Sequence, residues 1–273
     1  MNGDLLTSRP TKPLESGSFG ASRPILLILN TPLPDYETLK PLWENSSFRM
    51  CVDGGANKLH DLLPKALRKR HLPSMIHGDL DSLRDDVRTF YSAEKVSITR
   101  DGDQYSTDFG KALKTIRSIR SSPNRSSSFF LWNYVIVLGS ISGRVDQGIG
   151  LLHELLREHV NDTSTKLYLF SESSISYILP PGESAIELDM ENGLLTENVG
   201  ILPIYGPATI STQGLEWDVQ DWKTEMGGIV STSNHIKNEV VRIKTDAHVL
   251  FTVERTKETP SIEHEVDGVS GAQ

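Results

Sequence analysis

Aspartates recur in this chain where an apolar run gives way to a turn. Residues 75–84 read MIHGDLDSLR, in which Asp79 and Asp81 follow Gly78. Comparable turns hold four further members of the set: Asp53, Asp103, Asp108 and Asp146. Carboxylates that converge on one edge repel one another unless a cation neutralises them. Magnesium suits such hard oxygen ligands, because it binds through a few carboxylates plus substrate phosphates. The pattern therefore predicts a magnesium-dependent site for a phosphorylated ligand.

Each of these side chains also has an ordinary structural interpretation. Short polar residues before a helix commonly cap its free amides, which could apply to Asp81, Ser82, Thr107 and Asp146. Arg144 in a glycine-flanked turn could bind a phosphate or simply be a solvated surface arginine. Repetition at successive strand ends favours a site, because capping does not require aspartate each time. We expect Ser82 to be the ordinary helix cap, and Asp79 and Asp81 to bind the cation.

The elements that must position these residues follow from the apolar runs. Continuous runs, typical of strands buried on both faces, occupy residues 24–30, 48–53, 74–77, 95–99 and 134–139. Helical spacing of apolar residues lies between them, at residues 82–93, 107–119 and 145–160. This alternation predicts an α/β domain with a doubly wound, mostly parallel sheet. Ligands bind such sheets at the carboxyl ends of the strands, which is where the aspartates fall.

The second half of the chain has a different pattern. Short runs separated by turn residues predict strands at 166–170, 176–179, 184–188, 208–212, 228–231, 240–243 and 249–253. They indicate a C-terminal all-β sandwich. The expected division is a disordered leader at 1–22, an α/β catalytic domain at 23–172, the sandwich at 173–256 and a flexible tail at 257–273, with a surface loop at 120–128.

Composition excludes several classes of protein. The 273 residues carry 28 Lys and Arg against 36 Asp and Glu, a net charge of −8, which argues against a general nucleic-acid binder. A single cysteine, Cys51, allows no intrachain disulfide and no cysteine-based zinc site. No run of about 20 apolar residues and no secretory signal core is present, so we expect a cytoplasmic protein. The chain also lacks a P-loop, a dinucleotide fingerprint and a nucleophile elbow.

Taken in order, the motifs resemble those of the thiamine pyrophosphokinase family of the eukaryotic type. They are DGGAN at 53–57, GDLDS at 78–82, DQ at 103–104, TDF at 107–109, LG at 138–139, GRVDQ at 143–147, GLEW at 214–217 and STSN at 231–234. The resemblance covers roughly residues 25–253, in both predicted domains. It departs at Tyr105 and Ser106, where some members of the family carry another acid.

The resemblance implies an enzyme, thiamine diphosphokinase. It would transfer the pyrophosphoryl group of ATP to the hydroxyl of thiamine, giving thiamine diphosphate and AMP, and would work with Mg²⁺ as a homodimer. The implied catalytic residues are Asp79, Asp81, Asp103, Gln104 and Asp108, and the metal ligands among them are Asp79, Asp81 and Asp108. The implied nucleotide-site residues are Asp53, Gly54, Gly55, Asn57, Arg144 and Asp146. Thiamine would contact Gln104, Trp217, Ser231 and Asn234, in a site completed across the dimer interface.

Two other functions stay open at this point. One is a different magnesium-dependent transferase that uses a nucleotide, because Asp-x-Asp turns also serve such enzymes. The other is a non-catalytic sensor of thiamine or thiamine diphosphate, although a degenerate sensor would be expected to lose one of Asp79, Asp81 or Asp108. Without the resemblance, Trp217 would be interpreted as a tryptophan of the sandwich core. Nucleotide and metal preference and the role of the tails are left open.

Overall fold

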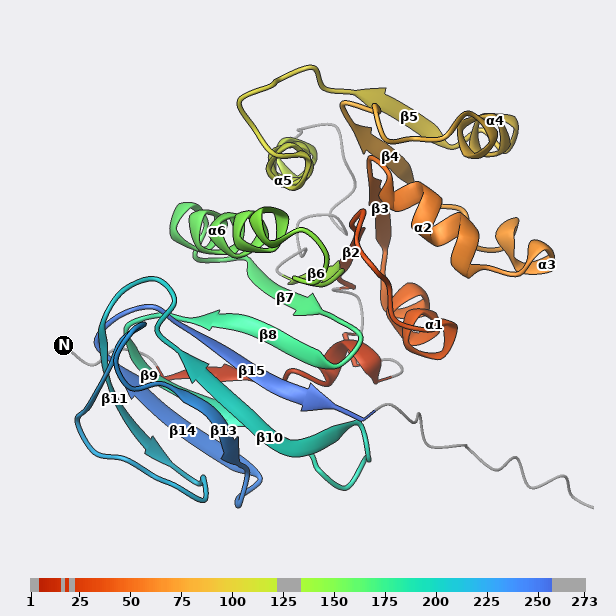
Figure 1. Cartoon of the computed structure of the whole chain (residues 1–273). Helices are drawn as coiled ribbons and strands as arrows, with labels where there is room; N and C mark the ends of the chain where they lie inside the picture. Colours follow the sequence, from red (N-terminus) through yellow and green to blue (C-terminus); the bar gives the residue numbers. More distant parts are fainter. Residues whose placement is uncertain (1–4, 16–17, 20–22, 122–133, 257–273) are drawn as a thin grey trace, which may run out of the picture.

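The computed structural model describes residues 5–15, 18–19, 23–121 and 134–256 (Figure 1). The strands in these segments are β1 (Leu6–Ser8), β2 (Ile25–Ile28), β3 (Phe48–Val52), β4 (Met75–Gly78), β5 (Ser97–Arg100), β6 (Tyr134–Leu138), β7 (Lys166–Phe170), β8 (Ser174–Leu179), β9 (Gly182–Glu187), β10 (Leu195–Leu202), β11 (Ala208–Gln213), β12 (Trp222–Thr224), β13 (Ser231–His235), β14 (Val240–Thr245) and β15 (Val249–Arg255). The helices are η1 (Lys12–Leu14), a single 3₁₀ turn, and α1 (Tyr36–Asn45), α2 (Gly55–Leu62), α3 (Lys65–Arg68), α4 (Asp85–Ala93), α5 (Asp108–Arg120) and α6 (Val145–Asn161).

Within the described segments, one long sheet runs through most of the molecule. Its strand order is β13-β10-β15-β8-β7-β6-β2-β3-β4-β5, and the stretch from β7 to β5 is parallel throughout. Side chains of β2 alternate between two helical layers. Leu26 and Ile28 share a core with residues of α1, α2 and α4, whereas Ile25 and Leu27 pack with residues of α5 and α6. A strand buried on both faces is thus apolar throughout, and the predicted α/β fold with a mostly parallel sheet is confirmed.

The C-terminal part forms the predicted antiparallel layers. Strand β8 pairs antiparallel with β7, with Leu169 opposite Ser176, so the long sheet continues without a break into β15, β10 and β13. A second sheet with the order β1-β9-β14-β11-β12 covers it (Figure 1). In β14, Val241 and Ile243 are buried while Arg242 and Lys244 are exposed, the alternation expected of a half-buried strand.

Three predictions about elements are wrong. Part of the expected leader is ordered, because Leu6–Ser8 forms β1 and pairs with β9 through backbone hydrogen bonds, which need no apolar period. The helix expected from residue 82 begins at Asp85 with Arg84 as its N-cap, so Ser82 is not the cap. The strand expected at 228–231 instead starts at Ser231. The tail at 257–273 and residues 122–128 of the expected loop lie outside the described residues.

Several elements were missed by pattern reasoning. They are α1, which contains Pro41, α2, which follows a glycine pair, and β10 and β12, which are polar at one end. None of the helices in the described part of the chain combines the length and the hydropathy that a membrane span requires.

Candidate active site

Three carboxylates converge at the carboxyl ends of the parallel strands. Asp53 follows β3, Asp79 follows β4, and Asp108 is the first residue of α5. One oxygen from each lies within 4.8 Å of the other two. Strands β3 and β4 are parallel neighbours, so their ends meet at one edge of the sheet, and α5 packs against both. We call this group, together with Lys111 described below, the acidic site.

Close backbone approach makes the acidic site possible. A Cβ on Gly78 would lie 2.9 Å from Cβ of Asp53 and 3.3 Å from Oδ1 of Asp108, and the φ of Gly78 is +154°. Only glycine fits such a position. Asp53 (φ +45°) and Leu80 (φ +65°) also adopt positive φ, which is uncommon for residues with a side chain. Backbone strain of this kind concentrates at functional sites.

Asp53 has the most constrained carboxylate of the three. Its residue is 3% exposed, and Oδ1 is buried without a hydrogen-bond partner among the described residues. Burial raises its pKa and outweighs hydrogen bonds from the Gly54 amide and the Ser82 side chain that lower it, while the charges of Asp108 and Asp79 raise it further. A buried carboxylate oxygen without a donor, facing two further carboxylates, is the arrangement that a divalent cation completes. The residues present therefore fit a magnesium ion.

A buried lysine lies between the other two carboxylates. Lys111 is 2% exposed, and its Nζ is 3.2 Å from Oδ2 of Asp79 and 2.9 Å from Oδ1 of Asp108. Burial alone would lower the pKa of Lys111, but the hydrogen bonds to Asp108 and Asp79 outweigh it and raise the pKa. The lysine therefore stays charged and holds both carboxylates in place. Sequence reasoning missed Lys111, although its spacing of three residues from Asp108 on a predicted helix was an available signal.

The loop after β4 is clamped from α2. Asn57 donates from Nδ2 to the carbonyl of Ser82 (2.7 Å) and accepts from the amide of Arg84 (3.2 Å). The amide of Asp81 donates to Oδ1 of Asp79 (3.3 Å), while the exposed carboxylate of Asp81 accepts from the Ser82 hydroxyl (3.1 Å). The structure thus brings Asp53 into the group of three and leaves Asp81 outside it. Asn57 holds the loop through both the nitrogen and the oxygen of its side-chain amide.

The loop before α5 carries the next predicted residues. Asp103 accepts from the Ser106 hydroxyl (2.7 Å) and the Tyr105 amide (2.9 Å), and these bonds lower its pKa. Gln104 beside it is exposed and lies outside the acidic site. Thr107 caps α5 by accepting from the Gly110 amide (3.0 Å), so the capping alternative was correct for this residue.

The remaining predicted nucleotide-site residues fall in two places. A Cβ on Gly54 would collide with the Asn30 side chain, and one on Gly55 with the Ile28 carbonyl, so glycine lets α2 start directly against the end of β2. Arg144 and Asp146 lie at the start of α6 and pair with each other, Nη2 to Oδ2 at 2.6 Å. Both are exposed, and Asp146 is not part of the group of three carboxylates.

The predicted thiamine residues of the second domain meet in one cavity. Trp217, Ser231 and Asn234 line a hollow of about 320 Å³ at the edges of the two sheets, together with Trp222, which sequence reasoning missed. Asn234 is buried, and its side chain bonds the backbone amide (3.1 Å) and carbonyl (2.9 Å) of Trp217. Trp217 itself is 54% exposed, so the interpretation as a core tryptophan is wrong. We call this hollow the aromatic pocket.

Strand β3, which precedes Asp53 of the acidic site, and strand β13, which lines the aromatic pocket, lie far apart in the chain (Figure 1). Strand β13 carries Ser231 and Asn234, and seven strand-to-strand steps separate it from β3 in the long sheet. Adjacent strands are about 4.8 Å apart, so the separation is on the order of 30 Å. No single small molecule spans that distance.

Comparison with known proteins relates the N-terminal and C-terminal halves of the chain to the same family. Residues 39–169 match the family model "Thiamin pyrophosphokinase, catalytic domain", and residues 183–250 match "Thiamin pyrophosphokinase, vitamin B1 binding domain". The chain is 34% identical to thiamine pyrophosphokinase 1 of Arabidopsis thaliana over 262 residues, covering 92% of this chain and 93% of the relative. It is 30% identical to the thiamine pyrophosphokinase of Saccharomyces cerevisiae, covering 84% of each. The solved structure of thiamin pyrophosphokinase from Candida albicans matches with a TM-score of 0.81 at 25% identity, over 94% of this chain and 95% of the other.

Proposed function

Because this chain belongs to the thiamine pyrophosphokinase family and is an enzyme of that family, we propose that it transfers the pyrophosphoryl group of ATP to the hydroxyl of thiamine, giving thiamine diphosphate and AMP. The observation that carries the proposal is the acidic site, where three carboxylates converge and Oδ1 of Asp53 is buried without a hydrogen-bond donor among the described residues. Its position at the ends of parallel strands is where an α/β sheet binds ligands. Residues 23–172 would bind the nucleotide and the cation, and residues 173–256 the thiamine.

A magnesium ion would be held by Asp79 and Asp108, with Oδ1 of Asp53 facing it. When bound, it would supply neutralising charge for phosphate oxygens, which is the main requirement of phosphoryl transfer. Asp81 is a further candidate ligand, since its carboxylate is exposed at the same loop, where it accepts from the neighbouring serine hydroxyl.

The residues of the chain itself would do the positioning. Lys111 pairs with Asp79 and Asp108 and holds the two carboxylates in position. Gly54 and Gly55 let α2 start directly against the end of β2, so that the positive end of the helix lies beside Asp53, where a phosphate would be favoured. Asp103 or Gln104 would orient the attacking hydroxyl from the loop before α5. Arg144, whose guanidinium forms an ion pair with Asp146, would contact the nucleotide from the start of α6.

Thiamine would bind in the aromatic pocket. Its pyrimidine ring could stack on Trp217 or Trp222, and its cationic thiazolium favours aromatic faces and a chain of net negative charge. Ser231 offers a hydroxyl at the wall. The side chain of Asn234 is already used to hold the Trp217 backbone, so its role would be to position the tryptophan.

The separation of the two regions supports a homodimer. A pyrophosphoryl group can reach thiamine only if the aromatic pocket of one copy faces the acidic site of another. Exposed apolar side chains gather beside the pocket, with Met226 at 64% and Ile229 at 62% exposure. Three more, Ile141, Val145 and Ile149, are exposed at the start of α6. Apolar surface of this kind commonly becomes buried between subunits.

The reaction is tested by incubating the purified chain with thiamine, ATP and magnesium and quantifying the products. Equal amounts of AMP and thiamine diphosphate are expected. Formation of ADP in place of AMP would overturn the pyrophosphoryl transfer and indicate a different nucleotide-using transferase. Tight thiamine binding without turnover would instead indicate a sensor.

A further inference from the structure

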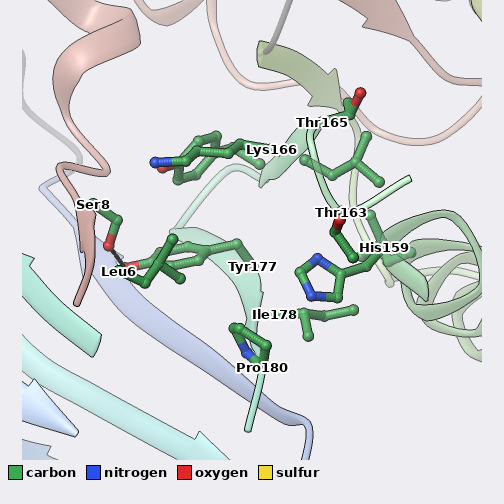
Figure 2. Close-up of a pocket in the computed structure, with 12 residues that line it drawn as sticks. Leu6, Ser8, His159, Thr163, Thr165, Lys166, Tyr177, Ile178 and Pro180 are labelled. Atoms are coloured by element: carbon green, nitrogen blue, oxygen red, sulfur yellow. Dashed lines mark hydrogen bonds between the residues drawn. The ribbon is translucent and has the colours of Figure 1, made fainter. Parts of the chain in front are cut away.

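A second cavity lies at the opposite end of the parallel strands from the acidic site. It has a volume of about 190 Å³ and is enclosed by the N-terminal strand β1, the C-terminal end of α6 and the strands β7 and β8 (Figure 2). Lys166, the first residue of β7, lines it, whereas the acidic site follows the last residues of β3 and β4. The proposed reaction uses no residue of this cavity.

The walls of the cavity are apolar and aromatic. Leu155, Leu167 and Ile178 supply aliphatic surface, and the rings of Tyr168 and Tyr177 supply aromatic surface. The Tyr177 hydroxyl is already bonded to Ser8 at 2.9 Å and therefore makes no demand on a ligand. Apolar cavities of roughly 150 Å³ in proteins stay dry and accept benzene-sized molecules. Aromatic walls favour an aromatic occupant, because ring pairs gain attraction beyond the area that they bury.

The cavity presents no charge to an occupant. No carboxylate is among its lining residues. The Lys166 stem lines the wall, but its Nζ donates to the carbonyl of Thr7 (3.0 Å) and lies 5.7 Å from the centre of the Tyr134 ring. Figure 2 shows the ammonium group at the far end of the stem from His159. A cation such as the thiazolium of thiamine therefore finds no counter-charge here, and an anion finds an ammonium that is already engaged.

His159 offers a polar side chain at the wall. The ring nitrogens of His159 make no hydrogen bond with another described residue, and in Figure 2 they face the side of the cavity that holds Tyr177. The ring of His159 packs edge to face against the ring of His248, with 5.5 Å between the ring centres. Burial, and then His248, lower the pKa of His159, so the ring is neutral near pH 7 and offers one donor and one acceptor.

We propose that this cavity binds a small uncharged aromatic molecule with one hydrogen-bonding group, which packs between Tyr168 and Tyr177 and bonds to His159. The occupant would contact β1 as well as β7, β8 and α6, because β1 forms one wall of the cavity. Binding should therefore raise the melting temperature of the full chain.

Phenol and toluene are matched probes, since they share a ring and differ in one hydroxyl. Calorimetric titration of the full chain should show saturable binding of both, with phenol about three- to tenfold tighter, the range of one neutral hydrogen bond. In His159→Phe, phenol should weaken to the level of toluene, while toluene is unchanged. Absence of saturable binding, or a phenol preference that survives in His159→Phe, would overturn the proposal.

Two tryptophan variants locate the site. Thr163 is an exposed residue at the rim, so Thr163→Trp should block the cavity and abolish binding of both probes. Asn161→Trp, at an exposed position nearby that does not line the cavity, should bind both probes as the unmodified chain does. Equal binding by the two variants, or displacement of phenol by thiamine, would place the probes elsewhere and contradict the proposal.

Discussion

The acidic site and the aromatic pocket are built in opposite ways. The acidic site brings Asp53, Asp79 and Asp108 together, with Oδ1 of Asp53 buried and lacking a donor among the described residues, on backbone with two non-glycine residues at positive φ. The aromatic pocket is uncharged at its centre, and its buried polar residue, Asn234, is bonded on both sides to Trp217. The acidic site therefore combines carboxylates that repel one another with strained backbone. In the aromatic pocket, the buried Asn234 side chain has hydrogen-bond partners and the Trp217 side chain is exposed.

This difference indicates which region performs chemistry and which performs recognition. Groups that must stabilise a developing charge are arranged in advance, at the expense of stability. Groups that bind a flat cationic ligand need aromatic surface and rigid support rather than charge. Changes in the acidic site should therefore lower turnover, and changes in the aromatic pocket should raise the KM for thiamine.

The largest effect is expected for Asp79→Asn. It removes a carboxylate charge from the acidic site while keeping the shape, so kcat should fall by about a thousandfold or more with the fold intact. Asp86→Asn, at an exposed position that pairs with Arg84, is the control and should retain activity. Asp81→Asn is predicted to abolish turnover too. Near-normal activity of that variant would remove Asp81 from the ligand set, and near-normal activity of Asp79→Asn would refute the assignment of the site.

Lys111→Met tests whether the buried ammonium holds the acidic site together. Its removal leaves the partly exposed carboxylates of Asp79 and Asp108 without their counter-charge, at a cost of about 1–3 kcal/mol. In the presence of a chelator the variant should melt well below the unmodified chain, and added magnesium should raise its melting temperature more than that of the unmodified chain. Lys114→Met, exposed on the same helix, should behave normally. Equal magnesium responses in the two variants would contradict the role of Lys111.

Asn234→Ala probes the aromatic pocket. Loss of the two hydrogen bonds to Trp217 should lower the free energy of unfolding by about 1–3 kcal/mol and raise the KM for thiamine, with a smaller change in kcat. Asn238→Ala, at an exposed position that does not line the pocket, should change neither. A fall in kcat at unchanged KM would place Asn234 with the chemistry and remove the contrast between the two regions.

The smallest change in melting temperature is expected for Asp53→Asn, and it should be an increase. The pKa of Asp53 is raised in the folded state, so the folded protein binds this proton more tightly than the unfolded chain does. Stability from this group is therefore lost as pH rises through the folded pKa, and the ionised carboxylate is destabilising at neutral pH. In chelator at pH 7 the variant should melt higher by roughly 2–4 °C, although it is less active. The gain should vanish below the ordinary pKa of about 3.9. A lower melting temperature at pH 7 would show that Asp53 is not strained.

The sequence was informative where a local pattern reports directly on structure. Apolar runs located β2, β3 and β6, and aspartates at strand ends located the acidic edge of the sheet. The same patterns said nothing of Lys111, because a lysine on a helix is ordinarily solvated and only tertiary packing buries this one. They also failed to separate Asp53 from Asp81, since the two differ in the backbone geometry of their turns. Strand β1 was missed because backbone pairing to an edge leaves no side-chain period.

The central claim is that the acidic site of one copy acts with the aromatic pocket of another. Two chains carrying different tags, one with Asp79→Asn and one with Trp217→Ala, can be co-expressed and purified as a mixed dimer. One of its two sites would then combine an intact acidic site with an intact pocket, so about half of the unmodified activity is expected at low thiamine, while each variant alone is nearly inactive. Activity no higher than that of the separate variants would contradict the claim and place both regions of a working site in one chain.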